Sequence, residues 1–352
     1  MKRLPARIFR TAGETPAVRR APVLSVNGLS VRFTTERGVV HALENVSFDV
    51  QAGQTVALVG ESGSGKSVTS LAILRLLPHS GHIVAGQILY RGFGSAPVEL
   101  ATASERTLRG IRGAGVGMIF QEPMSALNPA FTIGFQIAET IRLHQKTSMS
   151  QAHEQAQALL TTVGIAEPGR RLGEYPHQLS GGMRQRAMIA MAVACRPALL
   201  IADEPTTALD ITTQAQVLLM LRDLQAELGM GILFVTHNLA LVPMIADRVI
   251  VMYAGQIVEA GDASAVLDAP KHPYTRGLLE CLPARHLPRD RTTWHDLPTI
   301  EGTAVDLIDR PFGCAFASRC PIVADACRQR APELRPVAGA DRSSRCWRTD
   351  ML

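Results

Sequence analysis

Short apolar runs alternate along the chain with longer stretches in which apolar residues recur every three or four positions. Short runs bounded by glycine, proline or charged residues are typical of strands buried in a parallel sheet, and the periodic stretches are typical of amphipathic helices. This alternation predicts an α/β fold. The runs lie at residues 55–59, 116–120, 198–202 and 231–236, and the helical stretches at residues 134–144, 149–163, 181–194 and 212–228.

A different pattern precedes the first buried run, where apolar and polar side chains alternate in short segments. Alternation of this kind predicts a small antiparallel layer beside the core. Phe33 lies in this layer, and its ring either stacks on an adenine base or is an ordinary buried strand aromatic; the pattern alone does not separate the two. The expected strands are residues 24–27, 30–33, 46–50 and 86–90, and residues 249–261 predict a hairpin that closes the core.

Residues 60–67 fit the pattern G-x-x-x-x-G-K-[ST] at every fixed position, between a predicted strand and a helical stretch with Leu71, Leu74 and Leu77 on one side. That context indicates a phosphate-binding loop rather than a glycine-rich linker. Lys66 is placed to reach the β- and γ-phosphates, and Ser67 to bind Mg²⁺. The predicted nucleotide-binding residues here are Gly60, Glu61, Ser62, Gly63, Ser64, Gly65, Lys66, Ser67 and Val68.

Polar residues follow the other buried runs: Gln121 after the second, Asp203 and Glu204 after the third, and His237 after the fourth. Parallel strands present their carboxyl ends at one edge of a sheet, where α/β proteins place their chemistry. We expect Asp203, with Ser67 and Gln121, to hold Mg²⁺, and Glu204 to orient an attacking water. His237 is expected at the γ-phosphate, although a histidine after a strand is often only a satisfied polar residue.

Ser180, Gly181 and Gly182 open a further helix. Serine is a good N-cap, and two glycines behind it leave bare N–H groups at the positive helix end, which favours a second phosphate contact over an ordinary loop. Asp210 lies near the cap of the helix that follows the acidic pair.

The composition indicates a folded globular protein rather than a disordered or membrane-spanning one. Hydrophobic residues make up 46% and charged residues 19% of the 352 residues, which is typical of a folded chain with a sizeable core. The net charge of +5 could suggest nucleic acid, but Lys and Arg are dispersed apart from clusters near the two ends, so a solvated surface is the better interpretation and nucleic acid is not predicted as a partner. No apolar run reaches the roughly 20 residues of a membrane span, and no signal peptide is predicted, so we expect a cytoplasmic location.

Residues 1–22 are rich in Lys and Arg, with Glu14 as the single acid, and lack apolar periodicity. We expect a flexible basic tail, with contact to anionic lipid as the alternative.

In this order, the motifs resemble those of the nucleotide-binding subunit of an ABC transporter over about residues 23–261. The resemblance implies a P-loop ABC-type domain with a RecA-like core, an antiparallel β layer and a helical subdomain. It makes Phe33 the adenine-stacking aromatic, residues 60–67 the Walker A loop, Gln121 the Q-loop glutamine, residues 179–185 the signature segment, Asp203 the Walker B aspartate, Glu204 the catalytic glutamate, Asp210 a D-loop residue and His237 the switch histidine.

Residues 120–129, 201–210 and 272–279 resemble the oligopeptide/dipeptide importer branch, to which glutathione and nickel importers are close relatives. The resemblance implies an ATPase that uses ATP and Mg²⁺ to power peptide import from the cytoplasmic face of the cell membrane. It implies a head-to-tail dimer with a second ABC ATPase subunit, identical or paralogous. It further implies two transmembrane permease subunits docked near residues 123–127, and an extracytoplasmic peptide-binding protein.

Two other functional classes fit the sequence less well. Soluble ABC ATPases of DNA repair or translation carry a long coiled coil or two cassettes, which this chain lacks. A regulatory pseudo-ATPase is disfavoured by the intact Lys66, Glu204 and His237.

The last ninety or so residues read as an irregular, proline-rich and cysteine-rich extension. Its cysteines, Cys314, Cys320, Cys327 and Cys346, are spaced C-x₅-C-x₆-C-x₁₈-C. In a cytoplasmic protein this clustering favours a metal over disulfides, but it lacks the tight pairing of zinc sites, so an iron–sulfur cluster, zinc and free thiols all stay open. The importers resembled share this extension, and some carry a [4Fe-4S] cluster in it, which favours the cluster.

The expected domains are residues 1–22 (tail), 23–262 (nucleotide-binding domain, with a helical subdomain at about 122–197) and 263–352 (extension).

Overall fold

The computed structural model describes residues 21–93, 96–122, 126–207, 209–282, 298–337 and 341–352. Most of the predicted basic tail lies outside these residues. So do residues 123–125 of the expected permease-docking segment and Ala208 of the expected D-loop.

The centre of the described chain is a mixed sheet with the strand order β11-β12-β10-β9-β3-β8-β7-β6. These strands span Arg335–Pro336 (β11), Arg342–Ser344 (β12), Gln256–Asp262 (β10), Arg248–Tyr253 (β9), Thr55–Val59 (β3), Gly231–Thr236 (β8), Leu199–Asp203 (β7) and Val116–Ile119 (β6). From β9 to β6 all neighbours are parallel. Strands β3, β7 and β8 are buried along their whole length, which explains their uninterrupted apolar sequence.

A second, antiparallel sheet has the order β2-β1-β4-β5. Its strands span Gly38–Val50 (β2), Leu24–Thr35 (β1), Gly81–Tyr90 (β4) and Val98–Glu99 (β5). The prediction of two strands at 24–27 and 30–33 was wrong in one respect, because both belong to β1. An irregularity in register between Val26 and Leu29 absorbs Gly28, which has a φ of 61°, so the strand continues through the bend.

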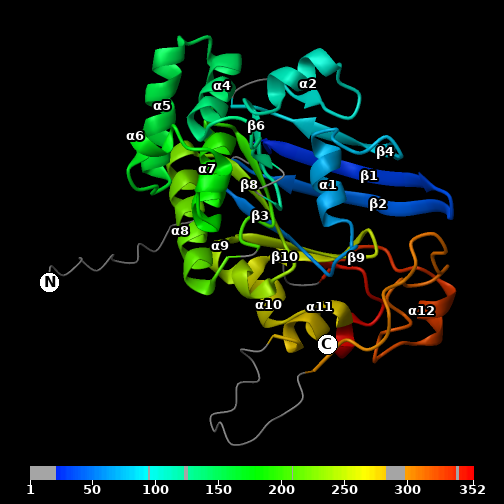
Figure 1. Cartoon of the computed structure of the whole chain (residues 1–352). Helices are drawn as coiled ribbons and strands as arrows, with labels where there is room; N and C mark the ends of the chain where they lie inside the picture. The colour runs from blue at the N-terminus through cyan, green and yellow to red at the C-terminus, as the bar shows by residue number, and fades with distance from the viewer. Residues whose placement is uncertain (1–20, 94–95, 123–125, 208, 283–297, 338–340) are drawn as a thin grey trace, which may run out of the picture.

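The helices pack against the sheets or on one another, and several begin at a side-chain cap. They span Lys66–Ile73 (α1), Glu105–Ile111 (α2), Ile133–Gln145 (α4), Met149–Thr162 (α5), Pro168–Arg171 (α6), Gly181–Val193 (α7), Ile211–Leu228 (α8) and Val242–Ile245 (α9). Thr132 caps α4, Ser148 caps α5 in a capping box with Gln151, and Gly229 ends α8 in the left-handed conformation. Figure 1 shows α4, α5, α6 and α7 gathered on the opposite side of the molecule from β1 and β2.

Helix α1 is shorter than the leucine spacing predicts. It ends at Ile73 because Arg75 takes a φ of 52°, and the N–H of Leu76 donates to the carbonyl oxygen of Leu71 to close the last turn. Leu77 therefore lies beyond the helix rather than on its face.

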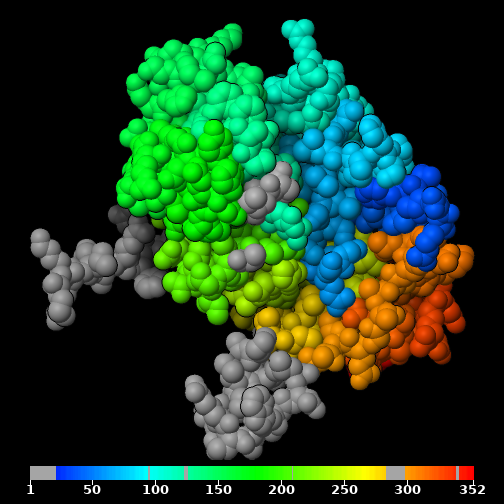
Figure 2. Space-filling model, in the orientation of Figure 1, coloured from blue at the N-terminus to red at the C-terminus, as the bar shows by residue number. Residues whose placement is uncertain are grey.

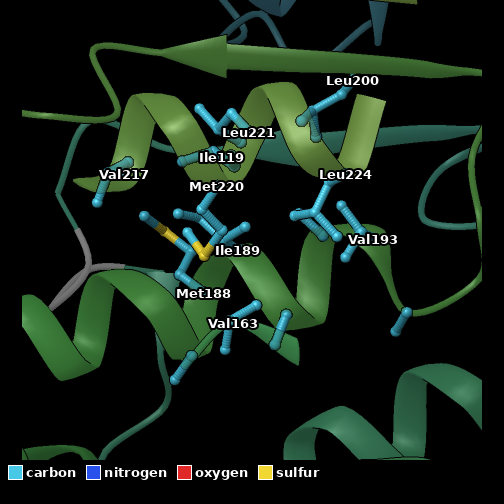
Figure 3. Close-up of a cluster of buried hydrophobic side chains, with 14 of the residues drawn as sticks. Ile119, Val163, Met188, Ile189, Val193, Leu200, Val217, Met220, Leu221 and Leu224 are labelled. Atoms are coloured by element: carbon cyan, nitrogen blue, oxygen red, sulfur yellow. The ribbon is translucent and has the colours of Figure 1, made fainter. Parts of the chain in front are cut away.

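The largest apolar core lies between α7, α8 and the central sheet. In Figure 3, Leu224 of α8 points toward Val193 of α7, and Leu221 and Ile189 belong to the same buried cluster. Leu221 and Ile189 have no exposed surface. Full burial of such a side chain contributes roughly 1.5–3 kcal/mol, which makes this layer a main source of the stability of the domain.

The segment after residue 262 contains more regular structure than the sequence predicts. It forms helices Ala263–Asp268 (α10), Pro273–Glu280 (α11) and Asp325–Gln329 (α12), and β11 and β12 extend the central sheet through the pairing of β12 with β10. Figure 2 shows the orange-to-red C-terminal part lying directly against the blue N-terminal strands. Among the described helices, none has the length and apolar character required to cross a bilayer.

Two leucines of α8 give a matched test of the core. We expect Leu221→Ala to lower the free energy of unfolding by about 2–5 kcal/mol, because the cavity left in this core does not collapse. Leu219, two residues away on the same helix, is 57% exposed, and Leu219→Ala should change stability by less than about 0.5 kcal/mol. Urea denaturation of both variants measures the difference, and equal losses would contradict the assignment of this core.

Candidate functional site

The loop between β3 and α1 has a backbone that only glycine can adopt at two points. A Cβ atom on Gly60 would lie 2.3 Å from the carbonyl oxygen of Met252, and one on Gly65 would lie 2.9 Å from that of Ala42. Both residues also have positive φ values, 154° and 103°. No side chain caps the start of α1, so its first N–H groups stay available for an anion.

Lys66 lies inside this loop. Its Nζ donates to the carbonyl oxygens of Gly60 and Glu61, both at 2.9 Å, and the residue is 5% exposed. Burial lowers the pKa of Lys66, and the negative charges of Glu204, Asp203 and Glu61 act against that shift. The loop therefore encloses a cation beside free backbone donors, which is the arrangement that binds polyphosphate.

Ser67 and Asp203 meet at the start of α1 and the end of β7. The Ser67 hydroxyl donates to Oδ1 of Asp203 at 3.2 Å. Burial raises the pKa of Asp203 to about 6, with the Ser67 hydrogen bond and the Lys66 charge acting in the opposite direction. A hydroxyl and a carboxylate side by side offer the hard oxygen ligands that Mg²⁺ prefers, so this pair fits the expected ion.

Glu204 is held by three polar side chains. Gln121 Nε2 and Thr207 Oγ1 donate to its Oε2 at 3.2 and 2.9 Å, and His237 Nδ1 lies 3.0 Å from its Oε1. Burial raises the pKa of Glu204, but the hydrogen bonds of His237 and Thr207 and the charge of Lys66 outweigh burial and keep the pKa below its ordinary value. A carboxylate that stays ionised at neutral pH suits the orientation of a water molecule better than strong proton abstraction.

The backbone of Glu204 is strained. Its φ is 49°, in the left-handed region that costs a residue with a Cβ atom about 1–2 kcal/mol. Its N–H donates to the carbonyl oxygen of Val235 in β8, which fixes the direction of the side chain. Strain of this kind gathers at functional sites, where the surrounding structure maintains it.

The predicted residues Ser180, Gly181, Gly182 and Asp210 lie at the starts of α7 and α8 rather than in the loop between β3 and α1. The Ser180 hydroxyl accepts from the N–H of Met183 and so caps α7, and Asp210 accepts from the N–H and hydroxyl of Thr213 and so caps α8. A Cβ atom on Gly182 would lie 3.4 Å from Thr213, whereas one on Gly181 would meet nothing within 4 Å. The two helix starts are neighbours, and the N-terminus of α7 is open to an outside molecule.

Phe33 of β1 and Val68 of α1 are both half-buried. The Phe33 ring covers Gly81 of β4, where a Cβ atom would lie 2.6 Å from it, and the ring is only partly buried. Val68 is half-buried on α1 against the core, and Ser62 and Gly63 are exposed at the tip of the loop. The described contacts of Phe33 are those of a strand aromatic whose ring is partly exposed.

All four predicted cysteines line one small cavity of about 20 Å³, together with Phe316 and Trp347. Burial raises the pKa of Cys314 to about 11 and also raises the pKa values of Cys320 and Cys346. Within the described residues, no group of three or more His, Cys, Asp or Glu is placed to hold a metal ion. Four cysteine thiols are the donor set both of a structural zinc ion and of an iron–sulfur cluster, so the donor chemistry fits either group.

Three residues of the site were missed at the sequence level. Thr207 donates to Glu204 and could have been found from its place one turn after the acidic pair. The Tyr274 hydroxyl accepts from the N–H of Glu61 at 2.8 Å, and Arg319 pairs with the Glu61 carboxylate. Tyr274 and Arg319 lie more than two hundred positions after Glu61, so no local pattern connects them to the loop.

Comparison with known proteins gives two family matches. Residues 43–207 match the model described as "ABC transporter", and residues 258–327 match the model described as "Oligopeptide/dipeptide transporter, C-terminal region". A putative peptide import ATP-binding protein of Brucella melitensis is 52% identical over 94% of this chain and 98% of its own length. The dipeptide transport ATP-binding protein DppD of Escherichia coli is 48% identical over 92% of this chain and 96% of its own length.

A solved structure has the same fold. It is the dimeric post-hydrolysis state of the ATP-binding cassette MJ0796 bound to ADP and Pi, and it is 25% identical with a TM-score of 0.60. The match covers 68% of this chain and 98% of that one. This likeness confirms the predicted α/β P-loop fold class.

The buried Asp203 gives a pH-dependent prediction. Its pKa of about 6 in the folded state exceeds the ordinary value of 3.8, so the folded chain binds more protons than the unfolded chain between these values. Stability should therefore fall as the pH rises through this window. Without nucleotide or Mg²⁺, we expect Asp203→Asn to be more stable than the wild type by about 1–3 kcal/mol at pH 7.5 and by about half as much at pH 5. Urea denaturation at both pH values measures this, and a pH-independent difference would refute it.

Proposed function

This chain belongs to the ABC transporter family, and from that premise we propose that it is the ATP-hydrolysing subunit of a peptide importer. The observation that carries the proposal is the juxtaposition of Lys66, Ser67 and Asp203 with a Glu204 that three side chains hold in place. The names of the relatives and the match to the oligopeptide/dipeptide C-terminal model support peptide as the substrate class.

In this proposal each residue of the site has a separate role at one bound ATP molecule. The loop N–H groups and Lys66 bind the β- and γ-phosphates of ATP, and Phe33 stacks on adenine with the exposed part of its ring. Ser67, Asp203 and Gln121 hold the Mg²⁺, which neutralises charge on the phosphates when it is bound. Glu204 orients the attacking water, and His237 contacts the γ-phosphate while it positions Glu204.

We also propose that the open start of α7 completes the site of a second subunit. Ser180 and Gly181 present free backbone there, and the side chains of Ser180 and Asp210 make their hydrogen bonds within α7 and α8. A second ABC ATPase subunit, identical or paralogous, would supply the triphosphate, in keeping with the dimeric state of the solved cassette. Two permease subunits and an extracytoplasmic peptide-binding protein complete the proposed importer, with this chain at the cytoplasmic face of the membrane.

The proposed domain division keeps the expected boundaries: a tail at 1–22, the nucleotide-binding domain at 23–262 with its helical subdomain at 122–197, and the extension at 263–352. The two family matches, at 43–207 and 258–327, support a domain boundary near residue 260.

The role of Glu204 has a direct test in the importer reconstituted with its permease subunits. We expect Glu204→Gln to bind ATP within about threefold of wild-type affinity, because the amide keeps the size and most hydrogen bonds of the carboxylate. ATP hydrolysis and ATP-driven peptide uptake should fall by at least about 10²-fold, because the charge that orients the water is lost.

Lys66→Ala serves as the control for this experiment, since it should lose nucleotide binding itself. Turnover by Glu204→Gln at the wild-type rate would refute the role of Glu204. ATP-driven uptake of glutathione or Ni²⁺, without uptake of peptides, would refute the substrate class.

We further propose that Cys314, Cys320, Cys327 and Cys346 together hold a [4Fe-4S] cluster. The donor set supports this, because four thiolates are the usual ligands of such a cluster. When bound, the cluster would join four points of a segment that has little regular structure of its own.

The cluster proposal predicts a composition. Full-length protein purified without oxygen should contain about four iron and four sulfide per chain, and Cys327→Ser should lose most of both. Cys195→Ser is the matched control, because Cys195 lies on another part of the chain. Iron and acid-labile sulfide assays decide the matter, and zinc without sulfide would contradict the cluster.

A further inference from the structure

Glu61, the second residue of the phosphate loop, forms a bidentate salt bridge with Arg319. Nη1 of Arg319 donates to Oε2 of Glu61 at 2.8 Å, and Nη2 donates to Oε1 at 3.2 Å. A bidentate salt bridge is stronger and more directional than an ion pair with a single hydrogen bond. The Arg319 side chain is only 5% exposed, so solvent ions screen this pair less than a surface pair.

Arg319 is fixed by its surroundings. Its Nε and Nη2 also donate to the carbonyl oxygens of Glu301 and Ile300, both at 3.1 Å. Its guanidinium carbon lies 5.8 and 5.9 Å from the ring centres of Tyr253 and Phe316. The arginine is therefore a rigid anchor, because its polar groups and its flat face are both engaged.

Tyr274 of α11 holds the backbone of the same loop residue. Its hydroxyl accepts from the N–H of Glu61 at 2.8 Å, and its ring lies 4.7 Å from that of Tyr253 and 5.4 Å from that of Phe316. Both the main chain and the side chain of Glu61 are thus held by residues that follow the hairpin β9–β10. Figure 1 shows α11 and the orange C-terminal segment on the same side of the central sheet.

The pairing has an electrostatic reason. A carboxylate in a loop that binds polyphosphate repels the ligand, and a low local dielectric strengthens the repulsion. Arg319 compensates this charge by pairing with both carboxylate oxygens of Glu61, while the Nζ of Lys66 donates to backbone oxygens. Arg319 also adjoins Cys320, which lines the cysteine cavity with Phe316, so one short segment contacts both the cavity and the loop.

We propose that Arg319 is a positioning residue of the ATP site, which neutralises Glu61 and holds the phosphate loop in its ligand-accepting conformation. This inference rests on the proposed function of the loop as an ATP site. It assigns to the C-terminal part of the chain a direct share in nucleotide affinity, exerted through Glu61 rather than through contact with the nucleotide.

The test uses equilibrium binding of Mg²⁺ and the non-hydrolysable analogue AMP-PNP to the full chain, measured by calorimetry. We expect Arg319→Met to weaken binding about tenfold at low salt, and less at 0.5 M NaCl, because salt screens the exposed charge of Glu61. Adding Glu61→Gln to Arg319→Met should restore affinity to within about threefold of the wild type, because the repelling charge is gone. A purely structural role of Arg319 would give neither the rescue nor the salt dependence.

Arg276→Met is the matched control, since Arg276 forms an exposed ion pair with Glu280 on α11 and not with Glu61. Its affinity should equal that of the wild type. If Arg319→Met fails to fold in thermal melts, Arg319→Gln keeps amide donors for the backbone oxygens and replaces it. Wild-type affinity in the single variant, or a double variant as weak as the single one, would overturn the proposal. A wild-type chain that binds no AMP-PNP would overturn the proposed function itself.

Discussion

The site depends on one constraint: an ammonium group must lie inside a loop that leads into a helix start without a side-chain cap. The constraint is met because Gly60 and Gly65 allow Met252 and Ala42 to approach closer than any side chain would permit. Those two neighbours belong to β9 and β2, one from each sheet. The loop therefore has its shape only when both sheets are in place, so the binding site and the fold form together.

The sequence predicted the parts of this arrangement that depend on local pattern. Buried runs indicated the parallel strands, and the rule that their carboxyl ends share an edge predicted that Gln121, Glu204 and His237 lie together. The fold class and the resemblance to ABC transporter ATP-binding proteins are both confirmed by the comparisons. The assigned roles of individual residues stay predictions.

What the sequence could not predict depends on contacts between distant residues. Arg319 and Tyr274 reach Glu61 from the far part of the chain, and neither has a local signal. The clustering of the four cysteines along the chain predicted that they lie near one another, whereas no local signal predicted that Phe316 and Trp347 line the same cavity. The strain at Glu204 was equally hidden, because a left-handed φ at a glutamate follows from its neighbours in β8 rather than from its own preference.

The pairing of β12 with β10 has a consequence for how the chain is made. Until residues 342–344 have been synthesised, the outer edge of β10 exposes unpaired N–H and C=O groups to any strand that passes. The nucleotide-binding part is translated before β12, so β10 lacks its outer partner strand while the rest of the chain is being synthesised. During this interval the nascent chain is prone to aggregate. Slower elongation between the two strands would lengthen that interval, which gives translation speed and chaperone supply an influence on the yield of native protein.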